Sequence, residues 1–304
     1  MPKQHRGGVL EKPPEFKVVA YAKLNLSLLV FHPNKKGYHP ICSVFQEISL
    51  HDQLTIQVIP EKTCLFQSNS PHFPTDQTNL LYQVYNKFKH HLSHGLHITV
   101  NKKIPMGSGL GGGSSNAAAL ITFINTFFKL NTSSIYQRSI AKSLGADIPF
   151  FLTGGTQLVR GIGEKCTPLP TKKNQYYVLI MPQIHSNTKS VFKHYDQQKE
   201  LKFPIKTPKS ILENYMGPND LKDTVYHLNP IIKRLENVLH QLNTPPIQLS
   251  GTGSTLFFTV SSWSHAIKWE KNLTTILDNC IVKAVKPISS SCTTTIKHVK
   301  NMDT

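Results

Sequence analysis

Acidic side chains are scarce in this 304-residue chain. Asp and Glu number 17 against 34 Lys and Arg, which leaves a formal net charge of +17, and no acidic residue occurs between Asp76 and Asp147. Such an excess of positive charge suits anionic partners, namely nucleic acid, anionic lipid or phosphorylated small molecules. A general basic bias of a solvated surface would give the same balance, so net charge alone does not identify the partner.

Cysteine is also sparse. The five cysteines stand at positions 42, 64, 166, 280 and 292, and none forms a Cys-x-x-Cys pair. An odd count without paired spacing argues against a zinc ribbon and against the disulfide framework of a small secreted protein. We therefore expect reduced thiols and a cytoplasmic protein.

Long apolar runs are missing as well. Runs such as 28–31 and 117–121 are far shorter than the ~20 residues that a membrane-spanning helix needs, so we expect a soluble protein with no membrane partner. Residues 1–16 hold no apolar segment of the signal-peptide kind and include Glu11 and Glu15, which are unusual in a transit peptide. This segment is predicted to be a flexible lead-in.

Apolar content is nevertheless sufficient for packed cores. Hydrophobic residues make up 39% of the sequence, and the length suits two domains of ~100–200 residues each. The patterns predict strands over 18–31, 44–50, 54–59, 96–100, 177–181, 256–260 and 281–285, and helices over 79–92, 120–130, 134–144, 230–242 and 266–277. We predict a mixed α/β (α+β) protein whose domains span 17–168 and 169–304, because 167–175 holds two prolines and few apolar residues.

A glycine-rich loop over 105–115 is the sharpest feature. It lies between a predicted strand and a predicted helix, where glycines let the backbone approach an anion and the helix N-terminus supplies free N–H groups. The loop lacks the Gly-Lys-Ser/Thr ending of a Walker A motif. Gly107, Gly109 and Gly112 match the Rossmann pattern, but the acidic residue expected ~20 positions later is absent. The loop predicts phosphate binding, with a flexible linker as the alternative.

Three motifs in order resemble those of the GHMP small-molecule kinases. The loop 105–115 is similar to the PxxxGLGSS signature, residues 23–26 (Lys-Leu-Asn-Leu) to the first family motif, and 248–254 (Gln-Leu-Ser-Gly-Thr-Gly-Ser) to the glycine-rich third. The resemblance implies two domains with the active site in the cleft between them. It also implies ATP as phosphoryl donor, with Mg²⁺ carried on the ATP.

Finer motifs, over a match of roughly 17–290, indicate one branch of that family. Residues 37–39, 145–151, 161–164 and 219–221 resemble the branch that phosphorylates a hydroxyl of a cytidine diphosphate-linked polyol in the non-mevalonate route to isoprenoids. The alternative is another GHMP kinase acting on a mevalonate-type, homoserine or sugar substrate, which has no base to stack.

Two residues are predicted to be catalytic. Phosphoryl transfer to a hydroxyl needs positioning and a proton acceptor, and Asp147 is an isolated acid among apolar neighbours. Lys23 interrupts an apolar strand and needs an anionic partner if buried. The resemblance implies that Asp147 is the base and that Lys23 keeps it ionised. The alternatives are a helix N-cap for Asp147 and a lysine reaching solvent from a strand end.

The resemblance also assigns the binding residues. For ATP they are Pro105, Met106, Gly107, Ser108, Gly109, Leu110, Gly111, Gly112, Gly113, Ser114 and Ser115 around the phosphates, and Asn79, Leu80, Leu81 and Lys102 around adenine. For the second substrate they are Asn25, Tyr38, His39, Phe45, Thr188 and Phe192. Tyr38, Phe45 and Phe192 are expected to stack on cytosine and His39 to bind its edge, although each aromatic taken singly also suits an ordinary core.

No cluster of residues has metal-site spacing, so no protein ligand for Mg²⁺ is predicted. The segment 250–254 either shapes the site or is simply a turn. A nucleic-acid partner is not expected, because the lysines are scattered rather than gathered in a stripe with aromatic residues. We expect small-molecule partners and a monomer or weak homodimer.

Overall fold

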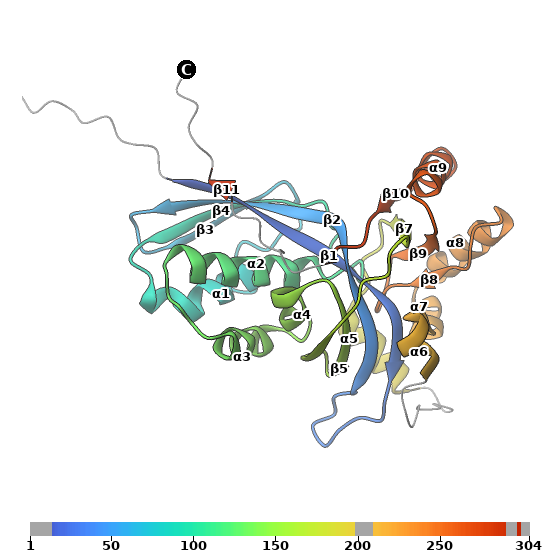
Figure 1. Ribbon diagram of the computed structural model, residues 1–304, viewed down its shortest axis with the longest axis horizontal. Helices are drawn as coiled ribbons and strands as arrows, with labels where there is room; N and C mark the ends of the chain where they lie inside the picture. Colours follow the sequence, from blue (N-terminus) through green and yellow to red (C-terminus); the bar gives the residue numbers. More distant parts are fainter. Residues whose placement is uncertain (1–13, 198–208, 290–296, 299–304) are drawn as a thin grey trace, which may run out of the picture.

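Two long antiparallel strands run through the whole molecule (Figure 1). In the computed structural model, which describes residues 14–197, 209–289 and 297–298, β1 (Glu15–Val30) pairs with β2 (Ile41–Ile59) from one end to the other. The expectation of two separate strands over 44–50 and 54–59 was wrong. The β1–β2 ladder contains a β-bulge, because Tyr21 faces His51 whereas the next residue, Ala22, faces Ile48. The ladder continues on both sides of this bulge.

The first sheet has seven strands and carries helices on one face. Its order is β11-β1-β2-β4-β3, and β5 and β6 extend from the other half of β2. Only β3 and β4 pair in parallel. The strands are β3 (Cys64–Ser68), β4 (Gly95–Asn101), β5 (Thr156–Gly161), β6 (Lys165–Leu169) and β11 (Lys297–His298). The helices gathered below it in Figure 1 are α1 (Leu80–Phe88), α2 (Gly112–Phe127), α3 (Ser134–Leu144) and α4 (Ile148–Thr153), with a 3₁₀ turn at Lys89–His91.

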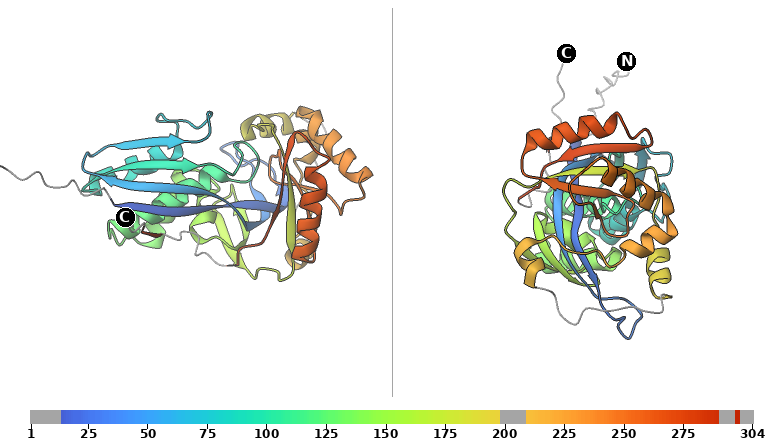
Figure 2. Two further views of the ribbon diagram at one scale, coloured as in Figure 1. Left: turned by 90° about the horizontal axis from the view of Figure 1, so that it is seen from above. Right: turned by 90° about the vertical axis from the view of Figure 1, so that its right-hand side faces the viewer.

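The second sheet has four antiparallel strands in the order β10-β7-β9-β8. They are β7 (Tyr176–Pro182), β8 (Gln248–Leu249), β9 (Leu256–Val260) and β10 (Cys280–Val285). Around this sheet lie α5 (Thr188–Tyr195), α6 (Lys209–Asn214), α7 (Lys222–Leu228), α8 (Pro230–Gln241) and α9 (Trp263–Thr274), as Figure 2 shows end-on.

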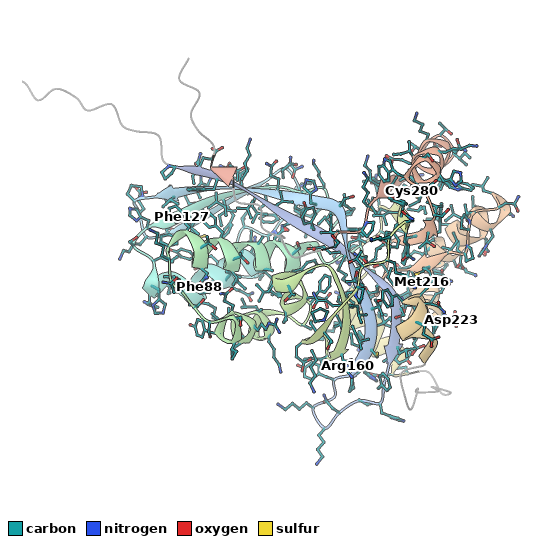
Figure 3. All side chains as sticks on the ribbon, viewed as in Figure 1. Phe88, Phe127, Arg160, Met216, Asp223 and Cys280 are labelled. Atoms are coloured by element: carbon teal, nitrogen blue, oxygen red, sulfur yellow. The ribbon has the colours of Figure 1, made fainter. Side chains whose placement is uncertain are left out.

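Three apolar cores hold these parts together. The first lies between the first sheet and its helices, and the second fills the space between the second sheet and α7–α9. Figure 3 labels Phe88 and Phe127 beside the first core and Cys280 beside the second. A third core joins the two sheets directly, since Leu24 of β1 packs with Tyr177 of β7 and Phe257 of β9.

The mixed helix-and-strand class is confirmed, and the longer elements lie close to where the sequence put them. Asn79 caps α1 with its side chain, and α3 ends at Gly145 as predicted. Asn229 precedes α8 but makes no side-chain cap. Of the predicted lead-in, residues 1–13 lie outside the described residues, and β1 already begins at Glu15. The domain boundary stays a prediction. Within the described residues no helix is both long and apolar enough to cross a membrane.

Candidate active site

A cleft of about 990 Å³ lies where the glycine-rich loop, the turn after β1 and the helix α5 meet. It brings together every residue predicted from the sequence except Leu110 and Ser115. Both of these are buried, Leu110 in the core between the sheets and Ser115 in the first turns of α2. Their contact with ATP stays a prediction, and the Leu110 carbonyl ties the loop to β1 by accepting from the Lys23 amide at 3.0 Å.

Lys23 lies at the centre of the cleft on β1. Its ammonium donates to Asn25 Oδ1 at 2.5 Å, lies 3.4 Å from Asp147 Oδ2 and sits 4.6 Å from the centre of the Phe45 ring. Burial lowers the pKa of Lys23, and the Asp147 carboxylate opposes that shift. Because Lys23 and Asn25 are two residues apart on one strand, they share a face. The side-chain amide of Asn25 donates to the Ser43 hydroxyl at 3.1 Å.

Asp147 occupies the N-cap position of α4 but does not cap it. Its side chain accepts no hydrogen bond from the helix, and its carboxylate points to Lys23 instead. The side chain is 31% exposed, whereas that of Lys23 is 4% exposed. The N-cap alternative thus describes the backbone position, while the carboxylate itself is directed into the cleft.

The glycine-rich loop leads into α2 through residues that need left-handed backbone. Gly109 has φ +78° and Gly111, the N-cap of α2, has φ +72°. Gly111 offers no capping side chain, so the first N–H groups of α2 are available to a ligand. Gly113 and Ser114 in that first turn line the cleft.

The segment 250–254 supports the loop from the second half of the molecule. The Ser250 hydroxyl donates to Gly109 O at 3.1 Å and accepts from the backbone amide of Asn25 at 3.2 Å. The Thr255 amide donates to Ser108 O at 3.1 Å. Gly251 and Thr252 line the cleft, so this segment shapes the site rather than serving only as a turn.

The side chains assigned to adenine already have protein partners. Asn79 accepts from the Leu81 amide at 2.9 Å and donates to Pro74 O at 2.5 Å. The Lys102 ammonium is paired with the fully buried Asp52. Leu80 lines the cleft beside the start of α2. These residues build the wall of the cleft, and their contact with ATP stays a prediction.

The far end of the cleft is aromatic. Tyr38 is 59% exposed there. His39 stacks on Phe192 with ring centres 5.8 Å apart and an interplanar angle of 26°. Both ring nitrogens of His39 already contact protein oxygens, Nδ1 with Phe31 O at 2.7 Å and Nε2 with Asp196 Oδ1 at 2.6 Å. Stacking or base-edge roles for these residues stay predictions.

Two further residues that were assigned to the substrate contact other parts of the protein, and their contact with substrate stays a prediction. Phe45 is 1% exposed and packs edge-on against Phe150, with ring centres 5.2 Å apart. The Lys23 ammonium lies over the Phe45 ring. Thr188 shares a hydrogen bond of 3.1 Å with Thr252.

Sequence reasoning missed several residues on α5. Lys189, Lys193 and Asp196 also line the cleft. With Thr188 and Phe192 they fall at helical spacing on one face, and that spacing would have found them once a helix had been predicted here.

Among the described residues, no group of three or more His, Cys, Asp and Glu side chains could hold a metal ion. Within the part of the chain that the structure describes, Cys64, Cys166 and Cys280 are free thiols.

Comparison with known proteins identifies relatives of this chain. Residues 79–155 match the GHMP kinases N terminal domain. The chain is 33% identical over 253 residues to 4-diphosphocytidyl-2-C-methyl-D-erythritol kinase of Clostridium beijerinckii, covering 79% of this chain and 89% of that one. It is 30% identical to the enzyme of the same name from Caldicellulosiruptor bescii, over 88% and 96% of the two chains.

Solved structures agree on the fold. A crystal structure of 4-(cytidine 5'-diphospho)-2C-methyl-D-erythritol kinase superposes with a TM-score of 0.71 and 25% identity, over 89% of this chain and 98% of that chain. Homoserine kinase from Cytophaga hutchinsonii, at a TM-score of 0.68 and 17% identity, shares the fold alone.

The two sheets, the glycine-rich loop between strand and helix, the domain match and the relatives define a small-molecule kinase of the GHMP class. Within that class, the chain belongs to the 4-diphosphocytidyl-2-C-methyl-D-erythritol kinase family.

Proposed function

We propose that this protein uses ATP to phosphorylate the 2-hydroxyl of 4-diphosphocytidyl-2-C-methyl-D-erythritol, releasing ADP and the 2-phosphate, in the non-mevalonate route to isopentenyl diphosphate. Membership of the kinase family supports the reaction. The observation that carries it is the pairing of Lys23 with Asp147 in the same cleft as the glycine-rich loop.

In the proposed phosphoryl transfer, Asp147 and Lys23 have different roles. Asp147 takes the proton of the hydroxyl as the hydroxyl oxygen bonds to the γ-phosphorus, and the bond from that phosphorus to the β-phosphate bridging oxygen breaks to release ADP. Lys23 pairs with Asp147 and stabilises negative charge on the transferring group. Asn25 holds the Lys23 ammonium in place through their hydrogen bond.

ATP is assigned to the end of the cleft that carries the start of α2. The N–H groups around Gly113 and Ser114 would receive the phosphates, because a helix N-terminus favours anions. Mg²⁺ is assigned to the ATP itself, since the described residues form no metal cluster. It would neutralise the charge of the β- and γ-phosphates.

The cytidine end is assigned to Tyr38 and Phe192, which line the cleft. Base–aromatic stacking contributes ~1–3 kcal/mol per base in nucleic-acid systems. Mevalonate, homoserine and sugars offer no base to such surfaces, which favours the cytidine-bearing substrate over those of the other GHMP kinases. We place the reaction in the cytoplasm, in keeping with the free thiols of Cys64, Cys166 and Cys280, and we expect the protein to be a monomer or weak homodimer.

A coupled assay of ADP release across a panel of alcohols tests the proposal. The panel holds the cytidine diphosphate-linked methylerythritol, mevalonate, homoserine and a set of sugars. We expect the highest kcat/KM with the cytidine-bearing alcohol. A higher value with any other member would overturn the substrate assignment while leaving the kinase class in place.

A further inference from the structure

Asp52 is a buried acid that the proposed phosphoryl transfer does not use. It lies on β2 opposite Ala20, it is fully buried, and it does not line the cleft. A carboxylate in the interior of a protein lowers stability unless it is paired and hydrogen-bonded. The groups that hold this carboxylate therefore show which parts of the molecule it connects.

Four donors surround the Asp52 carboxylate. Oδ1 accepts from the backbone amides of Lys103 at 2.7 Å and of Ile104 at 2.9 Å. Oδ2 accepts from the side-chain amide of Asn116 at 3.1 Å and from the Lys102 ammonium. A carboxylate offers about four acceptor sites, so the protein itself occupies all of them.

These donors come from the two ends of the glycine-rich loop. Residues 102–104 directly precede Pro105, where the loop begins, and Asn116 lies in α2, directly after the loop ends. The middle of the loop is held separately, by the hydrogen bond between Gly109 and Ser250. One carboxylate on β2 therefore joins the two ends of the loop at its base.

Lys102 and Asn116 carry this restraint into the cleft, since both of them line it. The Lys102 ammonium lies beside the first residue of α2, because a Cβ on Gly112 would be 3.1 Å from Lys102 Nζ. A lysine ammonium is carried on a flexible four-carbon stem, and its pairing with Asp52 fixes it at this end of α2. Asp52 thus determines the position of a charged group in the cleft without lining the cleft itself.

A loop that is ordered before its ligand arrives binds that ligand more tightly. Glycine has the most backbone freedom to lose on ordering, and fixing the loop in advance reduces the cost that binding must offset. Successive backbone N–H groups form an anion site only when their conformation makes them converge. The restraint at the base of the loop therefore bears directly on phosphate binding.

We infer that Asp52 is a positioning residue for ATP, which fixes both ends of the glycine-rich loop and the direction of the Lys102 ammonium without touching the nucleotide. The inference rests on the proposed function, because that function assigns ATP to this loop. A buried Asp–Lys pair that only stabilised the fold would change the fraction of protein that is folded. A positioning residue changes the ATP affinity of the protein that is folded.

The first test is Asp52→Asn. The amide oxygen can still accept from the loop amides, but the NH₂ group meets the donors of Lys102 and Asn116. We expect the KM and the calorimetric Kd for MgATP to rise about tenfold or more, as for the loss of one hydrogen bond to a charged group. The kcat at saturating MgATP and the KM of the alcohol should stay close to those of the wild type. A folded Asp52→Asn protein with unchanged KM and Kd for MgATP would overturn the inference.

Glu236→Gln is the matched control. Glu236 is 2% exposed, pairs with Lys222 at 2.6 Å and with Lys233 at 2.8 Å, and lies on α8 without lining the cleft. Removing this buried charge should lower the melting temperature and leave the Kd for MgATP unchanged. An equal rise of Kd in Glu236→Gln would mean that lost stability alone weakens ATP binding, which would refute the role of Asp52.

Hydrogen exchange at the amides of 106–115, measured without nucleotide, gives a second readout. Asp52→Asn should speed exchange there and leave β7 unaffected, because the loop alone loses its restraint. If Asp52→Asn does not fold, Asn116→Leu removes a single donor to Asp52 and should give the same changes at smaller size. Unchanged loop exchange in the folded variant would contradict the inference.

Calorimetry with MgATP alone separates this inference from the proposed reaction, because no alcohol is present. If the wild-type protein binds MgATP but phosphorylates no member of the panel, the proposed reaction fails, and the Kd values still decide the role of Asp52. A wild-type protein that does not bind MgATP would refute both.

Discussion

Lys23 Nζ lies 3.4 Å from Asp147 Oδ2, and the two side chains of this pair are unequally accessible, with the cation at 4% and the carboxylate at 31% exposure. Burial lowers the pKa of Lys23, and Asp147 counteracts that shift. The aspartate therefore opposes the loss of charge on the buried lysine, while its own carboxylate stays partly open to the cleft.

The first prediction concerns Asp147→Asn. The amide keeps the shape of the side chain but removes the acceptor and the charge opposite Lys23. We expect turnover to fall at least ~10²-fold, the range of general-base catalysis, with ATP affinity almost unchanged by calorimetry. Asp223→Asn, an exposed position on α7 outside the cleft, is the control and should retain full activity. Near-normal turnover of Asp147→Asn would assign the base to another group.

The second prediction compares two glycines of the phosphate loop. A Cβ on Gly113 would meet only Leu80 Cδ1 at 3.7 Å, an ordinary contact, whereas a Cβ on Gly109 would lie 2.2 Å from Ser250 O in a left-handed residue. Gly113→Val should therefore keep the melting temperature and weaken ATP about 10–100-fold, the loss of one hydrogen bond to a charged group.

Gly109→Val should lower both the melting temperature and ATP affinity, because it separates the loop from Ser250. Thermal melts and calorimetry on both variants provide the measurement. Unaltered ATP affinity in Gly113→Val would mean that the N-terminus of α2 does not hold the phosphates.

The third prediction concerns Tyr38→Ala. Tyr38 is 59% exposed and lines the cleft, so its removal should leave folding intact and take away one stacking face, roughly 1–3 kcal/mol. Titration of one protein sample with both ligands should show the cytidine substrate weakened about tenfold and ATP unchanged. Equal weakening of the two ligands would show that Tyr38 supports the fold instead.

The fourth prediction concerns Glu47, which lies directly opposite Lys23 in the β1–β2 ladder. Its side chain is fully buried, with Oε2 bonded to the Gly155 amide at 3.0 Å and Oε1 without a partner among the described residues. Burial raises the pKa of Glu47 from 4.5 to about 8, and the Gly155 amide opposes that shift.

Between these two pH values the unfolded chain ionises Glu47 and the folded protein keeps it protonated. Folding stability from this group is therefore highest below pH 4.5 and falls as pH rises to about 8, by up to about 1.4 kcal/mol per pH unit. Glu47→Gln should remove that slope and raise the free energy of unfolding more at pH 8 than at pH 5. The exposed Glu61→Gln is the control, and a slope that persists in Glu47→Gln would refute the assignment.

Local patterns predicted most of the longer elements because each carries its own signal. Asn79 caps α1, and the helical spacing after Ser134 ends at Gly145. Short elements such as α4 and α5 escaped prediction because six or eight residues hold too few turns for a period to show. The single strand β2 was divided in two because the polar residues His51, Asp52 and Gln53 interrupt its apolar pattern, although all three pair with β1.

Side-chain pairs depend on tertiary contacts that spacing does not reveal. Lys102 was assigned to adenine, but its partner Asp52 lies 50 positions earlier, on β2. Lys23 and Asp147 were joined only through the family resemblance. Asp196 carried no signal in the sequence because no helix was predicted over 188–195, and only the fold places it beside His39.

The connection between β1 and the second half of the molecule restricts how the cleft can open. The segment between α6 and α7 hydrogen-bonds to β1, where the Leu28 amide donates to Pro218 O at 2.8 Å and the Gly217 amide donates to Leu26 O at 3.1 Å, and the core around Leu24 and Phe257 fills the space between the sheets. A hinge that swings one half away from the other would have to break these hydrogen bonds and expose that core to water. Entry and release of ligands therefore fall to rim segments such as the turn that carries Tyr38, which can move without disturbing either sheet.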